Sequence, residues 1–237
     1  MIIGYSQSIK IEEINCKLSK NELMDVKNII QFESEFYKEM LDINPEKLIV
    51  KIKIFGNYRR YKMYQKRISK NNSNTGFYSQ KLKTAVIYKN ENFIKTISHE
   101  VSHVIMRSAI NPVPKWINEG FAEWFEGFYF LNNKMIINIQ IKKINKVRNW
   151  IKTNKLVIND FLNLSNKQWL AMNKSPKNFS YAVSYCIIYF LQLEHPNINK
   201  KMLTEIKLGK SSKEAINNSY PGGLNKFEND FMEYYGK

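Results

Sequence analysis

His99-Glu100-Val101-Ser102-His103 is the segment that decides the fold assignment of this 237-residue chain, and it uses two of only three histidines. Residues four apart on a helix differ in direction by about 40°, so His99 and His103 can point at one metal ion. Glu100 would lie beside that ion, where its carboxylate can accept the proton of a zinc-bound water. The pattern therefore predicts a zinc site on a helix. The alternative interpretation is a half-buried helix whose histidines only pack or cap.

The residues around this segment have helical periodicity. Asn111-Pro112-Val113-Pro114 ends the periodic run, because proline cannot continue a helix. The apolar positions that recur at helical spacing are Phe93, Ile94, Ile97, Val101, Val104 and Ile105. A helix is the context that the metal motif requires.

A catalytic zinc ion takes three protein ligands and leaves a fourth position to water. The next rigid segment, Lys115 to Glu126, carries Glu119 and Glu123 one helical turn apart among aromatic residues. Two acids on an otherwise apolar face are costly unless a cation or donor compensates them. We therefore expect Glu119 to be the third ligand. Glu123 either hydrogen-bonds a ligating histidine or lies on a solvated face, and the solvated face is favoured for Glu126.

The two segments together resemble a known family. The His-Glu-x-x-His pattern followed by Trp116-Ile117-Asn118-Glu119-Gly120-Phe121-Ala122-Glu123 resembles the gluzincin zinc metallopeptidases of the peptidase MA superfamily, which includes thermolysin and aminopeptidase N. The resemblance implies that Glu119 is the third zinc ligand and that Glu123 matches a further carboxylate of the thermolysin-like members. Fifteen residues separate His103 from Glu119, fewer than in aminopeptidase N. The chain is therefore more similar to small peptidase MA-like domains.

The segment Tyr181 to Leu191 extends the resemblance. It is similar to an aminopeptidase N helix that opens with a tyrosine whose hydroxyl supports the tetrahedral intermediate. The resemblance places Tyr181 at that position, where a phenol can donate to a developing oxyanion. The alternative is an aromatic packing stripe formed by Tyr181, Tyr185 and Tyr189, and this interpretation is favoured for the latter two.

These candidates favour zinc-dependent peptide-bond hydrolysis, with one Zn²⁺ and with Glu100 activating the zinc-bound water. The expected enzyme is a zinc metallopeptidase that acts on a peptide or protein substrate. One alternative is a catalytically inactive, metallopeptidase-like binding module. A less favoured alternative is a basic binder of nucleic acid or anionic surfaces.

The net charge of +16 comes mainly from lysine. The stretch Asn57 to Arg67 interleaves basic and aromatic side chains, as surfaces that bind single-stranded nucleic acid do. Its tyrosines repeat every three residues, which also suits an amphipathic helix with a solvated basic face. The helix interpretation is favoured over nucleic-acid binding.

Patterns along the chain predict an α+β protein. Ser19-Lys20-Asn21-Glu22 is a capping box that opens a helix to about Leu41. Strands are expected over Leu48 to Phe55, Phe77 to Gln80 and Thr84 to Lys89. A hairpin around Asn132-Asn133 then leads into helices, with a turn at Pro221-Gly222-Gly223.

The resemblance implies a zincin-like metallopeptidase fold, in which a small mixed sheet and an active-site helix precede a mostly helical C-terminal part. Residues 1–90 would form an α+β N-terminal part whose edge strand could receive a peptide. Residues 91–237 would form the mostly helical, zinc-binding catalytic part. We expect the two parts to pack as one compact unit with the zinc between them.

Apolar runs in the chain fall far short of the ~20 residues that span a bilayer. The first residues, Met1 to Ser6, have no signal-peptide pattern. The sequence as written predicts a cytoplasmic protein, or a secreted or cell-envelope protein if a signal was removed. Cys16 and Cys186 lack metal-binding or redox spacing and are expected to be buried thiols.

Overall fold

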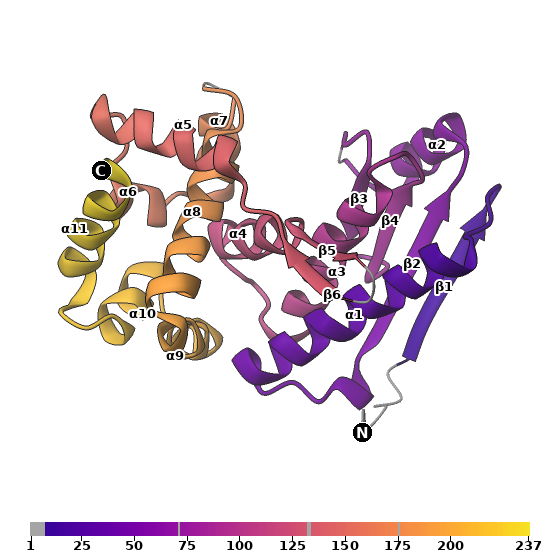
Figure 1. Cartoon of the computed structure of the whole chain (residues 1–237), viewed down its shortest axis with the longest axis horizontal. Helices are drawn as coiled ribbons and strands as arrows, with labels where there is room; N and C mark the ends of the chain where they lie inside the picture. Colours follow the sequence, from indigo (N-terminus) through magenta and orange to yellow (C-terminus); the bar gives the residue numbers. More distant parts are fainter. Residues whose placement is uncertain (1–7, 71, 132–133, 175) are drawn as a thin grey trace. The chain divides into compact units, whose positions relative to one another are not determined.

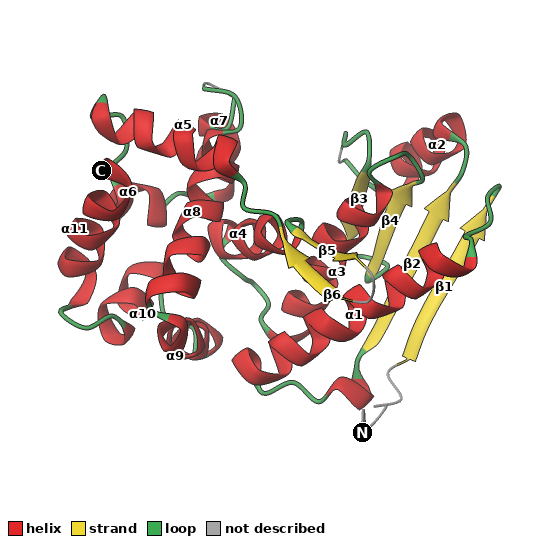
Figure 2. Ribbon diagram, viewed as in Figure 1, coloured by secondary structure: helices red, strands yellow, loops and turns green. Residues whose placement is uncertain are grey.

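The structure, a computed structural model, describes residues 8–70, 72–131, 134–174 and 176–237. It has the expected α+β class, with about 62% helix and a small sheet (Figure 2). The chain forms two compact units, and each unit contains two stretches of sequence. Unit 1 comprises Met1–Ser108 and Phe125–Asn138, and unit 2 comprises Ala109–Trp124 and Ile139–Lys237. The division into residues 1–90 and 91–237 that the sequence suggests stays a prediction.

Unit 1 contains a four-stranded mixed sheet with the strand order β1-β2-β4-β3 (Figure 1). Strand β2 pairs in parallel with β1 and β4, whereas the edge strand β3 runs antiparallel to β4. The strands are β1 Ser8–Ile14, β2 Ile49–Phe55, β3 Gly76–Ser79 and β4 Thr84–Tyr88. Four of the five residues of β4 are buried, as expected for an interior strand covered on both faces.

Three α-helices of unit 1 connect or follow these strands. They are α1 Lys20–Leu41 between β1 and β2, α2 Tyr58–Ile68 between β2 and β3, and α3 Phe93–Ala109 after β4. A short 3-10 helix, η1 Pro45–Lys47, precedes β2. The antiparallel pair β5 Phe128–Leu131 and β6 Lys134–Ile137 forms the expected hairpin, whose turn at Asn132-Asn133 lies outside the described residues.

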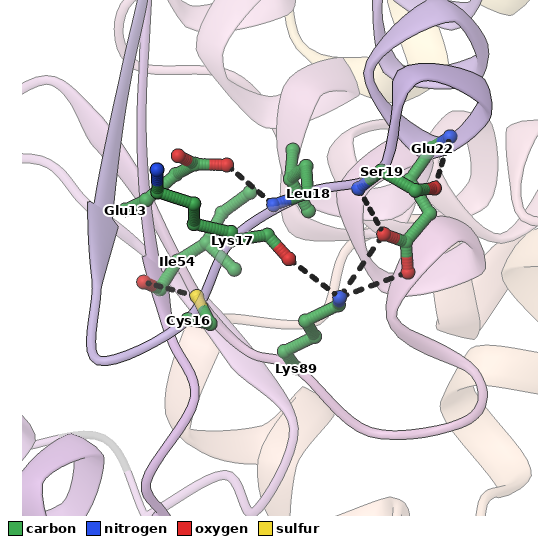
Figure 3. Close-up of polar contacts among 8 residues, drawn as sticks. All are labelled: Glu13, Cys16, Lys17, Leu18, Ser19, Glu22, Ile54 and Lys89. Carbon is green, nitrogen blue, oxygen red and sulfur yellow. Dashed lines mark hydrogen bonds and ion pairs between the residues drawn. The ribbon is translucent and has the colours of Figure 1, made fainter.

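Polar contacts around Lys89 hold the connection between β1 and α1 (Figure 3). The Lys89 ammonium donates to the carbonyl of Lys17 at 3.1 Å and to Oε2 of Glu22 at 3.0 Å. Glu22 also accepts from the backbone N–H of Ser19, so the capping box expected from the sequence is present. Because Lys89 directly follows β4, this cluster fixes the start of α1 relative to the centre of the sheet.

Unit 2 is helical, and α8 Phe179–Glu194 is its central helix. Every residue from Ala182 to Leu191 is buried, as in helices that are apolar on all sides. Helices α5, α7, α9 and α11 all contact α8. The remaining bounds are α4 Lys115–Phe125, α5 Ile141–Lys152, α6 Ile158–Leu162, α7 Asn166–Met172, α9 Pro196–Lys207, α10 Ser212–Ser219 and α11 Gly223–Gly236. The last residue of α4, Phe125, is counted with unit 1.

The expected elements lie within one or two residues of those observed, but β1 was not among them. The turn before α11 is confirmed, since Gly222 and Gly223 have positive φ angles of 86° and 76°. Cys186 is a buried thiol as expected, whereas Cys16 is only half-buried. Within the described part of the chain, every helix is too short or too polar to cross a membrane.

Candidate metal centre

Helix α3 carries the His-Glu-x-x-His segment, as the sequence predicts. The ring centroids of His99 and His103 lie 4.9 Å apart, with the ring planes at 89° to each other. The side chains of His103 and Glu100 are buried, and His99 is half-buried. Two imidazoles are therefore neighbours on one face of one helix, and we call them the histidine pair.

Glu126 follows α4 and lies next to His99, the first histidine of the pair. Its Oε2 atom lies 3.5 Å from Nδ1 of His99. A hydrogen on Nδ1 would point at the carboxylate, which leaves the lone pair of Nε2 available to a metal ion. A solvated face was the favoured interpretation for Glu126, and 37% of its side chain is exposed. The contact with His99 was not predicted, because spacing alone cannot separate Glu126 from Glu123 as the partner of a histidine.

A serine precedes each member of the histidine pair, and both serines are buried. The Oγ atom of Ser98 lies 2.8 Å from Oε1 of Glu33 and 2.9 Å from the carbonyl oxygen of Phe125. The Oγ atom of Ser102 lies 2.7 Å from the hydroxyl of Tyr37. Because Glu33 and Tyr37 are one helical turn apart on α1, this serine pair joins α1 to α3 at two successive turns.

An aromatic cluster fixes Phe125 against α1. The centroid of its ring lies 5.2 Å from that of Phe36 and 5.4 Å from that of Tyr37. Phe32 packs on the same ring and on Phe128 of β5. Aromatic packing of this kind adds about 0.5–1.5 kcal/mol per pair beyond area burial. It also holds the carbonyl of Phe125 where Ser98 reaches it.

Burial controls the ionisation of Glu33, Tyr37 and Tyr61 in unit 1. Glu33 is fully buried, and desolvation raises the pKa of its carboxyl well above the usual range, although the contact with Ser98 and the charge of His99 oppose the change. Desolvation also raises the pKa of the Tyr37 hydroxyl. It raises the pKa of Tyr61 as well, and the negative charge of Glu100 adds to that effect. All three groups therefore favour their neutral forms.

The N-terminal half of α3 lies close to the edge strand β3. A Cβ atom at Gly76 would come within 2.5 Å of Cγ2 of Thr96, so the approach depends on glycine. An edge strand next to α3 is thus present in unit 1. That this strand receives a peptide stays a prediction.

In unit 2, helix α4 presents the two carboxylates singled out in the sequence. Glu119 and Glu123 are 3% and 7% exposed. Lys115 forms an ion pair with Glu119, and Lys143 of α5 forms one with Glu123. Buried acids require a cation or donor to compensate them, and ammonium groups supply that compensation in the structure.

Tyr181 lies in the first turn of α8 and is half-buried. Its ring meets Trp169 edge-on, with centroids 4.7 Å apart. The Nζ atom of Lys115 lies 5.4 Å from the centroid of the Trp169 ring. Because Lys115 also pairs with Glu119, a chain of contacts within unit 2 links Tyr181 to Glu119.

Helices α4 and α8 approach closely at the residue after Glu119. A Cβ atom at Gly120 would come within 2.6 Å of the carbonyl oxygen of Ser184 and 2.7 Å of Cγ1 of Ile188. The packing stripe on α8 is present further along, where the rings of Tyr185 and Tyr189 stack with centroids 5.5 Å apart. The close approach at Gly120 therefore fixes where Glu119 lies along the axis of α8.

Helix α2 carries the mixed basic and aromatic stretch. Tyr61 is fully buried and packs with Phe55, Phe77 and Val86, and Tyr64 packs partly on the same group. The exposed basic residues of the helix are Arg59, Arg60, Lys66 and Arg67. Tyr61 and Tyr64 thus serve the core of unit 1, which supports the amphipathic-helix interpretation over a stacking surface for nucleic acid.

Residues 93–210 match the model of one family, described as a protein of unknown function (DUF1570). The match begins at the first residue of α3 and ends after α9, so it contains the histidine pair, α4 and Tyr181 but neither α1 nor the four-stranded sheet. No curated protein was found to match the chain.

Proposed function

We propose that the chain is a zinc-dependent peptidase in which His99, His103 and Glu119 hold one zinc ion. The observation that carries the proposal is the histidine pair on α3 with the Glu126 carboxylate at Nδ1 of His99. Histidines that ligate a metal commonly donate their other ring N–H to a carboxylate, which fixes the tautomer. The zincin-like assignment of the fold is part of the same proposal.

The donor set suits a catalytic zinc ion. Two imidazoles and one carboxylate are a common ligand set of hydrolytic zinc sites, and they leave one position open. When bound, the ion would polarise a substrate carbonyl and make a neighbouring water more acidic.

The other residues of the site have separate roles in this proposal. Glu100 follows a ligand directly in sequence, and its carboxylate would accept the proton of the attacking water and return it to the leaving amine. Tyr181 would donate a hydrogen bond to the oxyanion that develops on the substrate. Glu123 would support a ligating histidine, a role that Glu126 can share from its position at His99.

An inactive binding module would keep the same metal ligands but lack turnover. The discriminating experiment measures zinc by elemental analysis in protein purified without chelator, and cleavage of a peptide library by the same sample. The Glu100→Gln variant should keep the zinc and lose nearly all cleavage, because an amide cannot accept the proton. Glu91→Gln, at an exposed position just before α3, is the matched control and should behave as wild type.

The outcomes separate the alternatives. Zinc without cleavage in the wild type would favour the binding module. A wild type that retains no zinc after reconstitution would overturn the proposal. Loss of zinc in Glu100→Gln would mean that Glu100 is itself a ligand.

A further inference from the structure

Glu33 is a fully buried acid that the proposed reaction does not use. Its Oε1 atom contacts Ser98, and its Oε2 atom is buried without a hydrogen-bond partner among the described residues. Desolvation strongly destabilises an ionised carboxylate in such a place and destabilises a neutral acid much less. Burial accordingly raises the pKa of this carboxyl well above its usual range.

The hydrogen atoms available at Ser98 favour the same protonation state. A serine hydroxyl has one hydrogen, and here it lies within reach of both Glu33 and the carbonyl of Phe125. If Glu33 is neutral, its own proton can go to Ser98 and the hydrogen of Ser98 to the carbonyl, so that each contact is a hydrogen bond. If Glu33 is ionised, the one hydrogen of Ser98 must serve both acceptors.

The second contact lies one turn further along both helices. The hydroxyls of Tyr37 and Ser102 are 2.7 Å apart in the interior of unit 1. Successive residues of a helix differ in direction by about 100°, so each serine lies on the face next to that of the histidine that follows it. Two anchors one turn apart therefore set the rotation of α3 about its own axis.

We propose that Glu33, as an uncharged acid, and Tyr37 are positioning residues that aim the histidine pair through Ser98 and Ser102. The metal part of this inference rests on the proposed function. A binding geometry must be held within about 10–20° to remain productive, and rotation of α3 would move both imidazoles together. The anchors come from α1, whose start is fixed at the sheet by the contacts of Lys89 (Figure 3).

The protonation of Glu33 can be tested without any metal or substrate. The infrared spectrum of the full-length protein in heavy water at neutral pH should contain the carbonyl band of a protonated carboxylic acid. The band should be absent from Glu33→Gln and present in Glu39→Gln, which replaces an exposed acid on the same helix. Absence of the band from the wild type would overturn the uncharged state of Glu33.

Zinc affinity tests the positioning role. Competition with a chelator, at a temperature where each variant is fully folded, should give affinities at least about tenfold weaker for Tyr37→Phe and Glu33→Leu. Glu33→Gln should bind zinc within about threefold of wild type, because the amide can still donate to Ser98. The visible spectrum of the cobalt-substituted protein should change in Tyr37→Phe, which a purely stabilising role of the hydroxyl would not cause.

A double-mutant cycle completes the test. The double variant Tyr37→Phe/Ser102→Ala should bind zinc no more weakly than either single variant, since the two substitutions remove the same hydrogen bond. Zinc affinity and a cobalt spectrum unchanged in Tyr37→Phe would overturn the positioning role while leaving the proposed function intact. A wild type that binds no zinc would instead overturn the proposed function, and the infrared band would still decide the state of Glu33.

Discussion

The Nδ1 atom of His99 lies 3.5 Å from Oε2 of Glu126, so a residue just beyond α4 faces the first histidine of α3. A carboxylate in that position orients the imidazole ring and raises its basicity as a ligand. Glu126 would not need to bind a metal ion itself to have this effect. Its partial exposure also means that it can be replaced without opening the core.

We expect Glu126→Gln to weaken zinc binding by about tenfold to a hundredfold, because the amide is a poorer acceptor for the imidazole N–H than a carboxylate. Chelator competition measures the effect. Glu91→Gln serves as the control, since it removes an exposed acid shortly before α3. Equal zinc affinity in both variants would show that the contact with His99 has no part in metal binding.

Tyr181→Phe should lower turnover by roughly a hundredfold or more, while zinc content and KM stay near wild type, because only an oxyanion donor is lost. Steady-state kinetics on a peptide that the wild type cleaves measure turnover and KM. Tyr189→Phe is a better control on α8 than Tyr185→Phe, since the hydroxyl of Tyr185 accepts a hydrogen bond from the N–H of Gln140 at 3.1 Å and its loss would have an effect of its own. If Tyr181→Phe is as active as the control, the ring of Tyr181 only packs.

The ionisation of Glu33 should make stability depend on pH in a defined direction. The pKa of Glu33 in the folded protein is raised above the usual value of 4.5. The stability that the protonated side chain contributes is therefore fully present below pH 4.5 and is lost as pH rises through the folded pKa. Within that window the folded state binds more protons, and the free energy of unfolding should fall by about 1.4 kcal/mol per pH unit relative to Glu33→Gln. Urea denaturation of zinc-free protein over a pH series tests this. A difference between the two proteins that does not change with pH would contradict it.

Gly120→Ala should destabilise the protein by about 1–3 kcal/mol, because the new methyl group would meet the Ser184 carbonyl at 2.6 Å. Gly236→Ala is a suitable control, since its nearest neighbour, Cγ2 of Ile151, would be 3.9 Å away. Denaturant unfolding of both variants measures the difference. Similar stability of the two would show that α4 can move away from α8 at little cost.

Much of the fold could be predicted because its signals are local. The capping box at Ser19 and Glu22 marks the start of α1, and the prolines after Ile110 mark the end of α3. Strand β2 was expected from the alternating run of Leu48 to Phe55, and β4 from the short strand-like run of Thr84 to Lys89. Strand β1 was missed because the alternation of Ile9 and Ile11 with charged residues is short and ends at Glu12-Glu13, so its pairing with β2 is the main evidence for it.

The candidate site was predictable where it depends on one helix and not where it depends on several. The spacing of His99 and His103 predicts their neighbouring rings. The contacts of Glu33 with Ser98 and of Tyr37 with Ser102 join residues 65 positions apart, and no local pattern indicates such pairs. The ion pair of Lys143 with Glu123 was equally hidden, because the lysine belongs to a different helix.

The interleaved order of the two units limits how the chain can be divided. Unit 1 is completed only by Phe125–Asn138, after the chain has already entered unit 2. A fragment confined to residues 93–210 would keep the histidine pair but leave Ser98 and Ser102 without their α1 partners. Helix α3 therefore depends on a neighbouring helix for its orientation. A different scaffold into which α3 was grafted would have to place one acid and one phenol, a helical turn apart, beside Ser98 and Ser102.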